Sequence, residues 1–118
     1  VAAHMGANPR VVSDGVINLV SDKQVRTKRE LYKRQWRAYL SDAHYGLGWR
    51  IYNFNGHEVV MHAGGVAGFR SIISYSKELG IGHVMMMNAE SRVIDDLTAR
   101  FWDDQFKQAD AKSVAAAP

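Results

Sequence analysis

The chain has 118 residues, of which 47% are hydrophobic and 23% are charged, with a net charge of +3 and no cysteine. This composition predicts a soluble globular fold of about one small domain. It excludes a disordered chain, a disulfide-stapled scaffold and a cysteine-ligated metal site. No apolar run reaches the ~18–20 residues that a membrane-spanning helix needs, and no signal peptide is visible.

The positive charge is concentrated near the N-terminus. Seven basic residues lie between positions 23 and 37, close to Tyr32 and Trp36. Basic clusters with aromatic residues can bind nucleic acid, but nothing else in the chain is typical of a nucleic-acid-binding module. We therefore interpret this segment as a solvated surface and predict no nucleic-acid partner.

In chain order, the first predicted elements are helical. Residues 12–22 have Ser13 as a candidate N-cap and a face of valine, isoleucine and leucine. Residues 28–38 are a second, weaker helical candidate. We expect the N-terminal helical segment to lie away from the face of the sheet that the C-terminal helix covers.

Strand patterns follow. Apolar residues alternate from Tyr45 to Asn53, which predicts one strand with a buried face. Asn55-Gly56 predicts a hairpin turn, because both residues tolerate positive φ, and residues 57–62 predict the returning strand. Glycines at positions 64, 65 and 68 predict a break in the chain, after which residues 69–76 alternate again.

The last part of the chain predicts a turn, a strand and a helix. Residues 77–80 predict the turn, and residues 81–87 predict a strand buried on both faces, whose three successive methionines fill the core. A long helix is predicted from residues 88–91 to about Gln108. Its expected buried side contains Ile94, Leu97, Phe101 and Phe106.

Together these elements predict an α+β fold. It contains an antiparallel sheet of about four strands, with the long C-terminal helix packed on one face. We expect residues 1–110 to form one structural segment and residues 111–118 to form a flexible tail.

Three motifs carry chemical information. They are Tyr45-Gly-Leu-Gly-Trp49, the stretch from His62 to Ser71, and the apolar stretch from Gly82 to Asn88. In this order and spacing they resemble the C-terminal part of the serine β-lactamase and penicillin-binding-protein-like superfamily. The most similar branch contains class C β-lactamases, D-alanyl-D-alanine carboxypeptidases and related esterases. The resemblance covers roughly residues 10–108 and implies a partial β-lactamase-like fold.

The resemblance implies a role for four successive residues. His62-Ala63-Gly64 matches the third family motif, on the strand that borders the active site. His62 would supply a proton or hydrogen bond near the nucleophile or the substrate carboxylate. Ala63 lacks the hydroxyl that a more common Thr or Ser offers to substrate, and Gly64 lets a ligand approach the backbone closely. The N–H of Gly65 would form half of the oxyanion hole.

The other two family motifs are absent. The one literal Ser-x-x-Lys match, Ser74 to Lys77, closes a predicted strand, where residues three apart point to opposite faces, instead of opening a helix. No Tyr-x-Asn motif and no Gly-x-Ser-x-Gly elbow is present. The resemblance therefore implies that the nucleophile lies in a missing N-terminal portion and that this fragment alone does not turn over substrate.

Other kinds of site fit the sequence less well. His57 and His62 are five residues apart on one strand and face opposite sides, so no metal site is predicted. The glycines at 64, 65 and 68 lack the ending of a phosphate-binding loop. We predict no cofactor.

The functional expectation is a C-terminal fragment of a serine hydrolase that acts on a small amide, lactam or ester. A non-catalytic binding or scaffold domain of the same fold remains the alternative. We also expect self-association, because a sheet separated from its missing N-terminal portion exposes an edge and an apolar face. Family analogy suggests a periplasmic or extracellular location.

Overall fold

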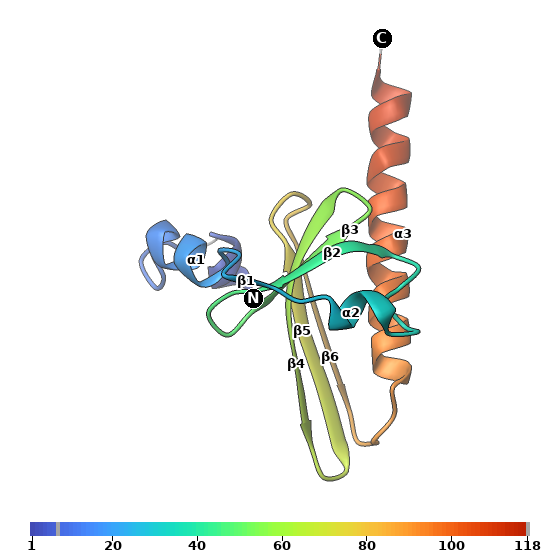
Figure 1. The fold of residues 1–118 in the computed structure, drawn as a ribbon. Helices are drawn as coiled ribbons and strands as arrows, with labels where there is room; N and C mark the ends of the chain where they lie inside the picture. The colour runs from blue at the N-terminus through green and yellow to red at the C-terminus, as the bar shows by residue number, and fades with distance from the viewer. Residues whose placement is uncertain (7, 118) are drawn as a thin grey trace.

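The computed structural model describes residues 1–6 and 8–117, which form an α+β fold (Figure 1). Six strands form one antiparallel sheet in sequential order: β1 (Val25–Arg26), β2 (Leu40–Tyr45), β3 (Arg50–Phe54), β4 (His57–Val66), β5 (Phe69–Ser76) and β6 (Ile81–Met87). The helices are η1 (Ala2–Met5), α1 (Asp14–Val20), α2 (Arg29–Tyr32) and α3 (Val93–Ala116). The predicted fold class is confirmed, with two strands more than expected.

The two unpredicted strands lack a clear alternating pattern. β1 has only two residues, and both are exposed. In β2 the register shifts between Leu40 and Asp42, so the buried residues Leu40 and Ala43 are not an even number of positions apart. Period-2 alternation is the sequence signal for a half-buried strand. Because the irregular register of β2 breaks this alternation, the sequence pattern does not predict β2.

The single strand predicted from Tyr45 to Asn53 is wrong. A turn interrupts it, since β2 ends at Tyr45 and β3 begins at Arg50. Gly48 has φ +81°. A Cβ on Gly46 would lie 2.6 Å from the carbonyl oxygen of Val20. Both positions therefore require glycine, and the turn packs against the end of α1.

Two hairpin turns set the register of β4. Asn55 and Gly56 have φ values of 50° and 101°, which confirms the predicted turn. The predicted break at residues 64–68 is shorter than expected, because Gly64 and Gly65 continue β4 and only Ala67-Gly68 turns the chain. The resulting β4–β5 hairpin extends past the other strands (Figure 1).

α3 covers one face of the sheet. Its buried residues are Ile94, Thr98, Ala99, Trp102 and Phe106. Leu97, which we expected on this side, is 44% exposed. The helix continues to Ala116, so the predicted helix end near Gln108 is wrong and residues 111–116 of the expected tail are helical, while Pro118 lies outside the described residues. Alanine is the strongest helix former, which explains the extension without tertiary support.

The opposite face of the sheet is only partly covered. Val1 and Met5 of the N-terminal segment pack against Ile51, Val60 and Tyr75. This cover reaches Gly82 of β6, where an added Cβ would collide with Val1, but it leaves Met86 79% exposed. The expectation that residues 81–87 are buried on both faces is therefore wrong, because α3 protects one face alone.

The N-terminal helices differ in how well they were predicted. α1 is present, and the Ser13 side chain accepts a hydrogen bond from Val16 N–H at 3.4 Å. α2 is a single turn, and residues 34–39 after it form turns that bury Trp36. No helix among residues 1–6 and 8–117 is long and apolar enough to cross a membrane.

Candidate functional site

Strand pairing determines where the backbone of β4 points. Phe54 pairs with His57 and Val66 pairs with Phe69 across two-residue turns. Residues that flank such turns hydrogen-bond to each other, so the backbone of His57 points toward β3 and that of Val66 toward β5. Along a strand the backbone N–H and C=O groups of successive residues point alternately to the two neighbouring strands. Both turns therefore give the same result: the N–H groups of the odd-numbered residues of β4 point to the β3 side.

β4 is longer than its neighbour β3. Arg50, the first residue of β3, pairs with Met61, so residues 62–66 extend beyond β3. The N–H and C=O groups of Ala63 and Gly65 therefore point to an edge where no described strand pairs with them. We call the β3 side of residues 62–66 the free edge. A ligand can form hydrogen bonds with this edge as an added strand does.

Side chains of His62 and Arg70 lie near the free edge, on opposite faces of the sheet. His62 points to the face opposite α3, where it pairs with Ile73 of β5, and its Nδ1 is buried without a described hydrogen-bond partner. On the α3 face, Arg70 crosses Gly65, and a Cβ at Gly65 would collide with the Arg70 guanidinium. Glycine at position 65 therefore leaves the backbone accessible and makes room for Arg70.

A polar cleft of about 360 Å³ lies beside the free edge on the α3 face. Its walls include Ala63, Gly65, Arg70, Ser91 and Arg92. The cleft therefore places charged side chains next to the N–H groups of the free edge. We name it the edge cleft.

Two acidic groups near the edge cleft already have partners. The Glu30 side chain is 4% exposed and forms an ion pair with Arg50, with 2.6 Å between Oε1 and Nη1. Glu90 accepts a hydrogen bond from the N–H of Gly68 at 2.7 Å. The second contact holds the tip of the β4–β5 hairpin against the segment before α3.

The rejected Ser-x-x-Lys match lies away from the free edge. Ser74 is fully buried in β5, where its Oγ accepts a hydrogen bond from Trp102 Nε1 at 3.0 Å. Lys77 lies in the following turn, with Nζ 3.4 Å from Asn18 Oδ1. Ser74 is therefore inaccessible to substrate and separated from the lysine that a nucleophile would need.

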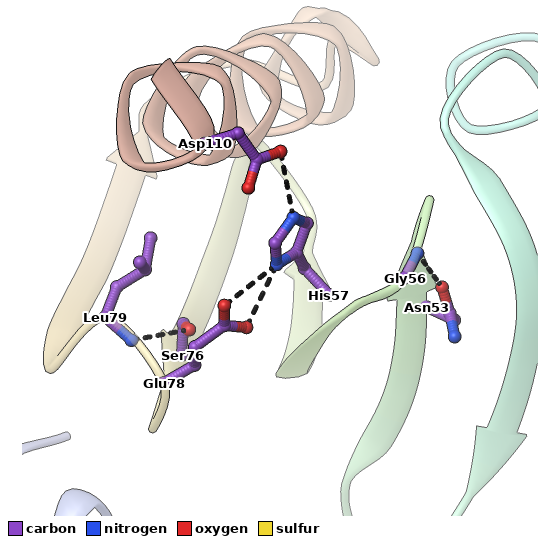
Figure 2. Close-up of polar contacts among 7 residues, drawn as sticks. All are labelled: Asn53, Gly56, His57, Ser76, Glu78, Leu79 and Asp110. Atoms are coloured by element: carbon purple, nitrogen blue, oxygen red, sulfur yellow. Dashed lines mark hydrogen bonds and ion pairs between the residues drawn. The ribbon is translucent and has the colours of Figure 1, made fainter. Parts of the chain in front are cut away.

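A cluster of His57 with two carboxylate groups, at the other end of the sheet, was not predicted. The His57 Nδ1 lies 3.0 Å from both carboxylate oxygens of Glu78, and Nε2 lies 3.2 Å from Asp110 Oδ2 (Figure 2). The imidazole also stacks on Phe106, with 4.3 Å between the ring centroids. This arrangement ties α3 to two turns of the sheet, and we interpret it as a structural contact.

The His57 cluster predicts a pH-dependent stability. The hydrogen bond to Glu78, with a second one to Asp110, raises the pKa of His57 above its ordinary value. The imidazolium's stabilising effect is therefore full below the unfolded-state pKa of about 6.5, as long as the carboxylates are ionised, and is lost as the pH rises through the higher folded-state pKa. Because both carboxylates are more than half exposed, we expect at most about 1 kcal/mol.

Urea unfolding of the wild type and of His57→Gln at about pH 5.5 and about pH 8.5 measures this contribution. The difference between the two proteins should shrink at the higher pH. Asp110→Asn should reduce the pH dependence in part. An equal difference at both pH values would contradict the prediction.

The face opposite α3 bears exposed apolar side chains near the hairpin. Val66, Phe69, Val84 and Met86 are 56–79% exposed, and Val66, Phe69 and Met86 line a groove of about 810 Å³. We call these four residues the uncovered face. Contiguous exposed apolar groups favour association.

We expect the 118-residue chain to self-associate through the uncovered face. The double variant Phe69→Ser/Met86→Ser should weaken association about tenfold or more in sedimentation velocity, because each buried apolar side chain contributes about 1.5–3 kcal/mol. Val114→Ser, which changes an exposed residue near the end of α3, is the matched control and should have no effect. A wild-type monomer at all concentrations would contradict this expectation.

Comparison with protein-family models, with curated proteins and with solved structures found no match. Any function of the chain is therefore argued from its own geometry and motifs. The described residues contain no group of three or more histidine, aspartate or glutamate side chains that could hold a metal ion.

The four predicted site residues follow one another on β4, with the N–H groups of Ala63 and Gly65 at the free edge and those of His62 and Gly64 directed toward β5. Sequence reasoning missed Arg70. Alternation in β5 puts Arg70 on the same face as Ile72, but the edge cleft depends on the unequal lengths of β3 and β4, which neither strand's own pattern predicts.

Proposed function

We propose that this chain supplies the third-motif strand and one oxyanion-hole donor of a serine hydrolase similar to β-lactamases and penicillin-binding proteins. The nucleophile would come from a segment outside these 118 residues. The substrate would be a small amide, lactam or ester that acylates a serine. By itself the chain would be inactive.

The observation that carries this proposal is the free edge. Gly65 lies beyond Met61, the residue of β4 that pairs with the first residue of β3. Its N–H therefore points to the side of β4 where no described strand pairs with it. A tetrahedral acyl intermediate requires N–H donors aimed at its oxyanion, and a rigid strand edge holds such a donor in place without reorganisation. The free edge thus supports the role that the motif resemblance implies for Gly65.

The neighbouring residues fit the same chemistry. His62 lies on the face opposite α3, so a nucleophile that approached from this face would meet its imidazole. The buried Nδ1 without a described partner would then hydrogen-bond to substrate or to the incoming segment. Gly64, also exposed, leaves the backbone beside the reacting group uncovered.

The native reading frame that contains the chain tests the proposal. We expect it to encode Ser-x-x-Lys at a helix start and Tyr-x-Asn upstream of Val1. The full-length protein should hydrolyse nitrocefin or p-nitrophenyl esters, and replacement of that serine by alanine should abolish hydrolysis. The matched control is Ser74→Ala, which should retain the activity if the protein folds.

The alternative is a non-catalytic binding or scaffold domain. A reading frame without either upstream motif would favour this alternative and overturn the enzymatic proposal. So would a folded full-length protein that hydrolyses neither β-lactams, D-alanyl-D-alanine peptides nor esters.

A further inference from the structure

The segment around α2 carries positive charge that the fold does not neutralise. Residues 23–37 contain seven basic residues and one acidic residue, Glu30. Two of the seven, Arg26 and Arg34, form ion pairs with aspartates, and Glu30 is paired with Arg50. The other five basic residues have no ion-pair partner among residues 1–6 and 8–117.

Two buried side chains hold this segment against the rest of the protein. Glu30 of α2 forms its ion pair with Arg50, and Trp36 packs against Tyr52 and Phe54, with ring centroids 5.4 and 6.1 Å away. The backbone around these two residues forms successive turns, closed by hydrogen bonds between residues three or four positions apart. The side chains that point to solvent are therefore held close together on a folded segment.

The solvent side of the segment combines cations with an aromatic ring. Lys28, Arg29 and Arg37 are exposed, and Tyr32 is 77% exposed. We call these four residues the basic surface. The segment lies against β2, at the outside of the fold (Figure 1). The basic surface therefore fits a partner that is negatively charged and that also accepts an aromatic ring.

A membrane with anionic lipids fits this combination better than a nucleic acid does. Proteins that bind single strands stack successive bases on several aromatic rings, but Trp36 is buried and Tyr39 is half-buried, which leaves Tyr32 alone. Duplex DNA is commonly read by a helix in the major groove, whereas α2 has four residues. At a membrane, lysine and arginine are attracted to anionic headgroups, and a tyrosine ring lies at the headgroup level.

We propose that the basic surface docks on anionic lipid headgroups. Lys28, Arg29 and Arg37 provide the attraction, and the ring of Tyr32 enters the headgroup layer. Each basic residue close to such a membrane strengthens binding by about fivefold, so the contact is reversible and sensitive to salt. The inference does not depend on the proposed function, because the basic surface shares no residue with the free edge.

Vesicle flotation of the 118-residue chain tests the proposal. We expect about tenfold or stronger partitioning onto phosphatidylcholine vesicles that contain about 30% phosphatidylglycerol than onto vesicles of phosphatidylcholine alone. Partitioning should fall when sodium chloride is raised from about 0.05 to about 0.5 M, because salt screens exposed charges. Equal partitioning onto the two kinds of vesicle, or none onto either, would overturn the proposal.

Variants of the basic surface test which residues make the contact. The triple variant Lys28→Gln/Arg29→Gln/Arg37→Gln should lower partitioning onto the anionic vesicles about tenfold or more. Tyr32→Ser should lower it about threefold and leave its salt dependence in place, because the ring carries no charge. Circular dichroism checks that each variant is folded. A folded triple variant that binds like the wild type would overturn the proposal.

The matched control removes the same charge elsewhere. Arg10→Gln/Lys107→Gln/Lys112→Gln changes three exposed residues outside the basic segment, so it should retain most of the partitioning. A loss as large as that of the triple variant would show that net charge alone causes binding, and would overturn the basic surface as the docking site. Binding to a short oligonucleotide without binding to anionic vesicles would overturn the proposal in favour of a nucleic-acid partner.

Discussion

Replacing Gly65 by proline in the full-length protein, which we propose to be a hydrolase, is expected to lower kcat by about 10²–10³, because this substitution would remove one of the two proposed oxyanion donors. Proline lacks the N–H but is tolerated on an edge strand whose N–H faces away from the sheet. Steady-state hydrolysis of nitrocefin or of a p-nitrophenyl ester measures the effect.

Gly65→Ala is the matched control for the proline variant. It retains the N–H, and it shares with proline the Cβ that would collide with the Arg70 guanidinium. We expect Gly65→Ala to lose far less kcat than Gly65→Pro. Equal losses in the two variants, or a proline variant that folds and keeps full kcat, would show that the Gly65 N–H is not an oxyanion donor.

Replacing Trp102 by alanine is expected to lower the free energy of unfolding by about 3–5 kcal/mol. Trp102 has no exposed surface and packs against Phe101 and Phe106, with ring centroids 5.1 and 5.7 Å away. Its Nε1 also donates the hydrogen bond to buried Ser74. The loss combines an unfilled cavity with one lost buried hydrogen bond, and urea unfolding measures it.

Two further variants serve as controls for the Trp102 prediction. Trp102→Phe retains most of the ring but not the N–H donor, so it should cost clearly less than Trp102→Ala. Leu97→Ala changes an exposed residue of the same helix and should alter the free energy by about 0.5 kcal/mol or less. If Leu97→Ala cost as much as Trp102→Ala, the described packing of α3 would be wrong.

The sequence correctly predicted elements that depend on the backbone preferences of a few neighbouring residues. Ser13 placed the start of α1, and Asn55-Gly56 placed a turn because two adjacent positive φ angles need such residues. The same reasoning failed at α3, where Leu97 fits the helical pattern and yet points to solvent. Periodicity identifies an apolar stripe, but the sheet's position decides which side of that stripe is buried.

The candidate site was predicted in part. The residues from His62 to Gly65 were identified from the motif, and the structure places them together on the extended part of β4. Their availability to a ligand was not predictable, since it depends on β3 starting at Arg50 and pairing with Met61. The His57 contacts with Glu78 and Asp110 were missed because they join residues up to 53 positions apart.

The sequence by itself determined the α+β class, the hairpin turns, the long C-terminal helix and the motif on β4. These features follow from short-range backbone preferences and from periodicity, which act within a few residues. Only the tertiary structure decided which backbone groups stay unpaired, which apolar face stays exposed and which charges meet at the edge cleft. Those properties depend on strand register and on relative strand length, which arise from contacts between distant segments.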